Sequence, residues 1–171
     1  KSSELSPLTY KIVSCLERDS FNPDDAIDWA IEMIELGYEN DSILILASFQ
    51  KPANYFEILE YIKSALMELD LKIKTEEDAI MSFASYYVLK IANQIDIKQN
   101  IKILFNYCIS KNYNKALYDF YLLYWALDEL GAENSETDTY WHGMNASNAK
   151  SIIINVAKNW LENHQSAIRI K

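Results

Sequence analysis

Apolar residues recur along the chain at steps of three and four positions, and no stretch alternates convincingly between apolar and polar residues. This spacing is the period of an α-helix, whereas a half-buried strand would repeat every second residue. The pattern predicts an all-α fold of about eight helices, arranged as an irregular helical bundle or as a short, α-solenoid-like stack of antiparallel helical hairpins. The expected helices span residues 8–18, 22–37, 43–49, 54–69, 75–95, 98–111, 114–130 and 147–164.

Local signals mark several of these helix ends. Asn22 and Pro23 supply an N-cap and a proline at the first helical position, and Gly37 supplies a stop. Asn54 followed by Glu57 resembles a capping box. No stretch rich in Gly, Pro or Ser divides the chain, so residues 1–171 are expected to form a single all-helical domain.

The expected helix 114–130 is hydrophobic nearly all round. Its leucines and Phe120 are joined on other sides by Tyr118, Tyr121 and Trp125, and between Ala116 and Leu127 only one residue is charged. Such a helix is typical of a buried central element. We therefore expect the other helices to pack around it. The longest polar connection, 132–145, follows it.

Composition narrows the class of protein. The 171 residues carry a formal net charge of −9, half of them are hydrophobic, and only three are glycine and two arginine. A chain of this length can bury a core without a metal or a disulfide, so Cys15 and Cys108, on apolar faces, are expected to be buried thiols in a reducing compartment. Few glycines argue against phosphate-binding loops, and few arginines argue against nucleic acid.

The cellular setting follows from the same composition. The longest aliphatic run, Ile43 to Ala47, is far too short to span a bilayer, so no membrane association is expected and a cytoplasmic location is favoured. Twenty-one isoleucines, fourteen asparagines and fourteen lysines against two arginines are typical of an AT-rich coding sequence and favour a bacterial source.

The excess negative charge is concentrated in one part of the chain. Residues 19–50 contain eight acids and no base. On a helical wheel, six of these carboxylates fall within about 100° of arc, and the other residues from Ala26 to Leu36 are all apolar. The acids on this arc are Asp24, Asp25, Asp28, Glu32, Glu35 and Glu39.

Two interpretations of this acidic face remain open. An amphipathic helix needs a polar face, and the helix dipole favours the aspartates near its start. The glutamates near its end are disfavoured by the same dipole and repel one another, which is better explained by a surface that docks a basic partner. The candidate partner-binding residues here are Asp24, Asp28, Glu32, Glu35, Glu39 and Asp41.

A second candidate lies in the long connection, where Tyr140, Trp141 and His142 follow one another. These side chains either fold back over the core or anchor a partner, since Tyr and Trp dominate interface hot spots. A contact through His142 would be sensitive to pH.

Signals for catalysis or metal binding are weak. His142 and His164 lie far apart in sequence and no Glu-x-x-His motif occurs, so no metal and no cofactor is expected. Ser48-x-x-Lys51 and Ser147-x-x-Lys150 match a nucleophile spacing, but the accompanying motifs are absent. No catalytic residue is assigned, and an enzyme whose groups converge from separate helices is the third hypothesis.

Two resemblances can be stated. A pattern of residues between positions 29 and 57 resembles small uncharacterised bacterial helical proteins. Its members are Trp29-Ala30, Gly37-Tyr38, Ser42, Leu46-Ala47, Pro52, Asn54 and Phe56-Glu57. This first resemblance implies no activity. The acidic, helical and catalytically empty character of the chain also resembles the immunity proteins of interbacterial toxin systems. That second resemblance implies a cytoplasmic inhibitor that presents carboxylates to a basic, nuclease-like toxin domain.

The leading hypothesis is therefore a non-enzymatic protein-binding module, an immunity-type inhibitor that docks a basic partner protein through the acidic face of helix 22–39. The alternative is an α-solenoid-like scaffold or adaptor that binds a peptide or protein in an inter-helical groove. A concave surface lined by tyrosines would favour the alternative.

Overall fold

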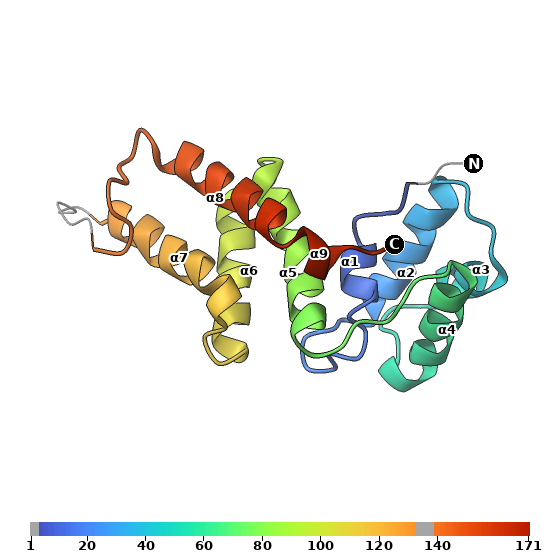
Figure 1. Cartoon of the computed structure of the whole chain (residues 1–171). Coiled ribbons are helices and arrows are strands. Elements are labelled where there is room, and N and C mark those ends of the chain that lie inside the picture. Colours follow the sequence, from blue (N-terminus) through green and yellow to red (C-terminus); the bar gives the residue numbers. More distant parts are fainter. Residues whose placement is uncertain (1–3, 133–138) are drawn as a thin grey trace. The chain divides into compact units, whose positions relative to one another are not determined.

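The computed structural model describes residues 4–132 and 139–171, and within these ranges every regular element is helical (Figure 1). The predicted all-α fold is confirmed. Residues 133–138 of the expected polar connection lie outside the described residues. The elements are α1 (Thr9–Ile12), α2 (Asp24–Glu35), α3 (Asp41–Ser48), α4 (Tyr55–Glu68), α5 (Glu76–Ala92), α6 (Ile97–Ser110), the 3₁₀ turn η1 (Lys115–Leu117), α7 (Tyr118–Leu130), α8 (Ala149–Asn163) and α9 (Gln165–Ile168).

The chain groups into two compact units. The first comprises residues 1–86 and 166–171, and the second comprises residues 87–165. Within each unit, helices that follow one another in sequence also pack against one another, as α2, α3 and α4 do in the first and α6, α7 and α8 in the second. Both a bundle and a hairpin stack have this property. A single folding domain stays a prediction.

The core of the first unit explains the position of α2. Most of the apolar side of α2 is buried, with Trp29 and Met33 inaccessible to solvent, although Ile31 and Ile34 are exposed. The Trp29 indole Nε1 donates a hydrogen bond of 2.9 Å to Thr9 Oγ1, which satisfies a polar group that burial would otherwise leave without a partner. The carboxylates of α2 consequently lie on the opposite side of the helix.

The predicted cap of α4 and the predicted stop of α2 are confirmed, whereas the start of α2 differs by one residue, because its N-cap is Pro23 and not Asn22. Asn54 Oδ1 accepts hydrogen bonds from the backbone N–H groups of Phe56 and Glu57, at 3.0 and 3.2 Å, and so caps α4. Asn22 Oδ1 accepts from the Asp24 N–H at 3.0 Å before α2. Gly37 adopts a φ of +93°, a left-handed conformation that glycine adopts without steric cost, directly after α2 ends.

The prediction of a first helix over residues 8–18 is wrong in its length. The regular helix α1 ends at Ile12, and turns follow it. The Val13 carbonyl accepts a hydrogen bond of 2.8 Å from the Lys74 N–H, and the Ser14 hydroxyl donates to the Ala79 carbonyl at 3.0 Å. These contacts with distant residues replace continued helical hydrogen bonds. Leu16, expected on the buried face, is exposed.

The second unit corrects the expectation for helix 114–130. The segment divides into η1 and α7, and only Phe120, Leu123 and Ala126 of α7 are buried. Tyr118 is 41% exposed, so α7 is not a central element surrounded by other helices. Its apolar character has another cause, because the rings on its outer side pack against one another. Ile95, expected to face inward, lies beyond the end of α5 and is exposed.

Candidate functional site

Two of the aspartates on α2 form ion pairs with lysines from elsewhere in the first unit. Asp25 Oδ2 lies 2.6 Å from Lys11 Nζ, and this pair is largely buried. Asp28 Oδ1 lies 2.5 Å from Lys51 Nζ, and this pair is exposed. The hydrogen bond from Lys51 to Asp28 raises the pKa of the lysine. The base-free segment 19–50 is therefore partly neutralised by bases that lie just outside it in sequence.

Two further carboxylates of the acidic face are hydrogen-bonded within the unit. Asp24 Oδ1 accepts from the Ala53 N–H at 2.8 Å, and Glu32 Oε2 accepts a short hydrogen bond from the Ser6 hydroxyl. These bonds hold the segments before α1 and before α4 against α2. Asp24 and Glu32 thus stabilise the packing of the first unit in addition to contributing negative charge.

The glutamates near the end of α2 and the residues after it remain open to solvent. Glu35, Glu39 and Asp41 are all exposed. The acidic face is consequently divided: its N-terminal half is bound to other parts of the unit, and its C-terminal half presents charge to solvent. The sequence located the carboxylates correctly but could not show this division.

A surface hollow of about 410 Å³ lies along the same face of α2. It combines four carboxylates with three apolar side chains: Asp25, Asp28, Glu32, Glu35, Leu8, Ile31 and Tyr86. Carboxylates beside apolar surface suit a cationic side chain with an aliphatic stem, because Lys and Arg bury the stem while the charged end stays polar. Leu8 and Tyr86 come from segments outside α2, so no local sequence pattern indicates the hollow itself.

Tyr140 stacks on Trp125 of α7, with ring centroids 6.1 Å apart and planes inclined by 28°. It remains 40% exposed, while Trp141 is half-buried and His142 is exposed. Tyr140 therefore packs against its own unit and still presents an edge to solvent, while the anchoring of a partner by this segment stays a prediction.

Tyr140 is the end of a continuous series of ring contacts, which we call the aromatic row. Phe105 of α6 stacks between Tyr121 and Tyr124 of α7, at centroid distances of 5.2 and 3.9 Å. Further contacts join the exposed rings at the other end. The row comprises Tyr113, Tyr118, Tyr121, Phe105, Tyr124, Trp125 and Tyr140. Helical spacing on α7 could have shown part of it, but the contribution of α6 could not be read from sequence.

The two sets of candidate residues belong to different units. The six carboxylates lie in the first unit, and Tyr140, Trp141 and His142 lie in the second. They therefore form two separate surfaces, one on each unit.

The groups considered for catalysis have structural roles. His164 Nδ1 lies 2.7 Å from the Trp160 carbonyl oxygen, and its ring packs on Trp160 at 4.6 Å, as expected for a packed histidine. The Ser48 hydroxyl donates to the Ile45 carbonyl at 2.6 Å, while Lys51 pairs with Asp28. Ser48 and Lys51 therefore do not form a serine–lysine nucleophile pair.

The cysteine thiols and the potential metal ligands are the remaining groups that could take part in chemistry. Cys15 and Cys108 are buried, and burial raises the pKa of each thiol to about 11, so both are protonated near neutral pH. Across residues 4–132 and 139–171, no three His, Cys, Asp or Glu side chains gather as metal ligands would. In the same ranges, each helix is too short or too polar to cross a bilayer.

Comparison of the chain with protein-family models, with curated proteins and with solved structures gave no match.

Proposed function

We propose that the chain is a non-enzymatic protein-binding module that docks a basic partner protein through the acidic face of α2. The observation that carries this proposal is the hollow in which Asp25, Asp28, Glu32 and Glu35 lie beside apolar side chains. A helix face that only contacts water needs charged side chains, but it needs no hollow lined by apolar ones. A hollow that joins charge with apolar surface also suits the insertion of an arginine or lysine side chain.

The surroundings of the hollow fit a docking surface. Ile31 and Ile34 are 44% and 36% exposed on α2, next to the open carboxylates. Exposed apolar side chains ringed by charge are common at interfaces, where burial supplies affinity and charge supplies steering. Glu35, Glu39 and Asp41 would attract a basic partner over distances of about a Debye length, roughly 8–10 Å at moderate salt.

The finer form of the proposal is an immunity-type inhibitor of bacterial origin that acts in the cytoplasm on a basic toxin domain. It is supported by the acidic helical character of the chain, by the structural roles of His164 and Ser48, and by the burial of both cysteines. An inhibitor of this kind needs no chemistry of its own, because it acts by covering a cationic surface of its target.

The experiment is a pull-down from the host cell with the wild-type chain and two charge-reversed variants. The variant Glu35→Lys with Glu39→Lys alters two exposed carboxylates for which residues 4–132 and 139–171 provide no hydrogen-bond partner. The control, Glu57→Lys with Glu162→Lys, has the same net charge but alters exposed acids on α4 and α8. We expect a partner that the wild type and the control retain and the first variant loses. A partner retained equally by all three would refute docking through α2.

The aromatic row favours a second candidate function, a scaffold or adaptor that binds a peptide or protein across α6 and α7. Tyr113, Tyr118 and Tyr140 are 53%, 41% and 40% exposed, and tyrosine is enriched at interface hot spots. Replacement of Tyr113 and Tyr118 by alanine discriminates the two functions. If the adaptor function holds, partner retention falls with these variants and is unchanged by Glu35→Lys with Glu39→Lys.

A further inference from the structure

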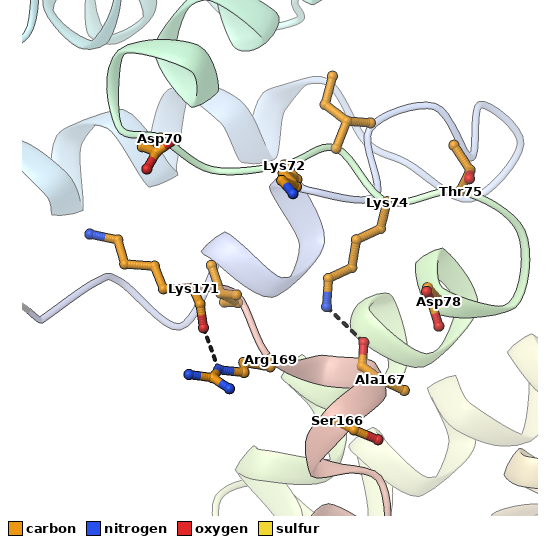
Figure 2. A pocket seen from close by; sticks show the side chains of 11 residues that line it. Asp70, Lys72, Lys74, Thr75, Asp78, Ser166, Ala167, Arg169 and Lys171 are labelled. Carbon is orange, nitrogen blue, oxygen red and sulfur yellow. Dashed lines mark hydrogen bonds between the residues drawn. The ribbon is translucent and has the colours of Figure 1, made fainter.

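A second cavity of the first unit, of about 680 Å³, lies between residues 70–78 and residues 166–171 (Figure 2). The two segments are far apart in sequence and are joined here by a hydrogen bond of 2.8 Å from Lys74 Nζ to the Ala167 carbonyl. A volume in this range is that of a small-molecule site rather than of a single ion.

Bases dominate the charge of this cavity, although the chain as a whole is acidic. Lys72, Lys74, Arg169 and Lys171 line it, against the two carboxylates of Asp70 and Asp78. One of the only two arginines in the chain is among them. In the part of the chain that the structure describes, none of these four bases is ion-paired with a carboxylate. Asp78 still acts on Lys74 electrostatically, so the lining neutralises part of this charge, but its four bases outnumber its two carboxylates by two.

Lys74 shows the electrostatic cost of this arrangement. Its side chain is half-buried, and burial lowers the pKa of its ammonium group. An ammonium group has three N–H donors, and one of them is bound to the Ala167 carbonyl. An anion in the cavity would accept from the remaining donors and stabilise the charged form.

Arg169 is oriented by the chain beside it. Its Nε donates a hydrogen bond to the Lys171 carbonyl, which Figure 2 shows as a dashed line. The bond fixes the plane of the guanidinium group and leaves its two terminal NH₂ groups as donors. A guanidinium edge of this kind matches two oxygens of a phosphate group.

The remaining polar side chains suit a different part of a ligand. Ser166 and Thr75 contribute hydroxyl groups, and Asp70 and Asp78 contribute acceptors, to the same cavity. Carboxylates repel a phosphate but accept hydrogen bonds from hydroxyl groups. We propose that this cavity binds a sugar phosphate, with the phosphate held by the four bases and the sugar hydroxyls by the aspartates and the hydroxyl side chains.

The test is isothermal titration calorimetry of the full chain with three probes: glucose 6-phosphate, inorganic phosphate and glucose. We expect saturable binding of glucose 6-phosphate, binding of inorganic phosphate weaker by about tenfold or more, and none of glucose. Failure of both phosphate probes to bind would overturn the proposal. Equal affinity for both would overturn the assignment of a sugar to the aspartates.

Variants locate the binding. The variant Lys72→Gln with Arg169→Gln alters two exposed side chains of the cavity, and the control, Lys98→Gln with Lys102→Gln, removes the same charge from exposed positions of α6. We expect the first variant to weaken glucose 6-phosphate binding by about tenfold or more and the control to leave it unchanged. Equal weakening by both would show a general charge effect and would overturn the assignment to the cavity. Far-ultraviolet circular dichroism verifies that each variant is folded.

Discussion

Lys11 Nζ lies 2.6 Å from Asp25 Oδ2, and the two side chains are only 8% and 17% exposed. The same ammonium group lies 5.4 and 5.2 Å from the ring centroids of Phe83 and Tyr86, in cation–π range. The pair joins α1 to α2, and its Asp25 is one of the residues that line the hollow on the acidic face. Part of the negative charge of that face is therefore compensated from inside the unit.

The first prediction concerns this ion pair. Lys11→Met should lower the free energy of unfolding by about 3 kcal/mol, because it leaves a largely buried carboxylate without its partner. Chemical denaturation with urea measures the change. The double variant Lys11→Met with Asp25→Leu should recover much of the loss, since it removes the orphaned charge. A loss below about 0.5 kcal/mol for Lys11→Met would show that the ion pair contributes little to the free energy of unfolding.

The second prediction concerns the cap of α4. Asn54→Ala should destabilise the protein by about 1 kcal/mol, because two backbone N–H groups lose their acceptor. Asn54→Asp should retain most of the stability, since its carboxylate accepts the same hydrogen bonds and favours the helix N-terminus. Thermal unfolding of the three chains side by side tests the ranking, which an equal effect of both substitutions would contradict.

The third prediction is a loss of stability at alkaline pH that involves Cys15. Burial raises the pKa of this thiol from 9.0 to about 11 in the folded chain. Between these values the unfolded chain loses the thiol proton while the folded chain keeps it, so the free energy of unfolding falls as the pH rises from about 9 to 11. Urea denaturation at pH 8, 9.5 and 10.5 measures the fall. The fall should be smaller in Cys15→Ala, and an identical pH dependence in that variant would assign the effect to other groups.

The fourth prediction separates charge from stability on α2. Glu35→Lys should change the free energy of unfolding by no more than about 0.5 kcal/mol, because Glu35 is exposed. Glu32→Lys should cost more, since the glutamate accepts a hydrogen bond from Ser6. Urea denaturation of both variants tests the difference. Equal stabilities would indicate that the Ser6 bond contributes nothing.

Local features of the fold were predictable from sequence, and features that depend on distant contacts were not. The Asn54 cap and the Gly37 stop require only neighbouring residues, and both were located correctly. The end of α1 depends on the hydrogen bond from Lys74 to Val13, which no local pattern shows. The division of helix 114–130 into η1 and α7 differs, because its cause is local: Asn114 Oδ1 accepts from the Ala116 N–H and tightens the first turn, and the apolar spacing alone does not indicate this.

The candidate sites show the same limit. The carboxylates of α2 were identified by their helical spacing, but their partners Lys11 and Lys51 come from outside the segment. The basic cavity was not anticipated, although Lys72-x-Lys74 and Arg169-x-Lys171 are both short pairs of bases at alternate positions. Such pairs are common in surface segments. Only the fold shows that these two line one cavity.

The proposed docking of a basic partner by the open carboxylates at and just after the end of α2 is tested by the affinity of the captured partner. The dissociation constant is measured by titration calorimetry at low and moderate salt for the wild type, for Glu35→Lys with Glu39→Lys, and for the control Glu57→Lys with Glu162→Lys. We expect charge reversal at Glu35 and Glu39 to weaken binding by about tenfold or more, the control to leave it unchanged, and salt to weaken the wild-type complex. Equal affinities for both variants, independent of salt, would contradict it.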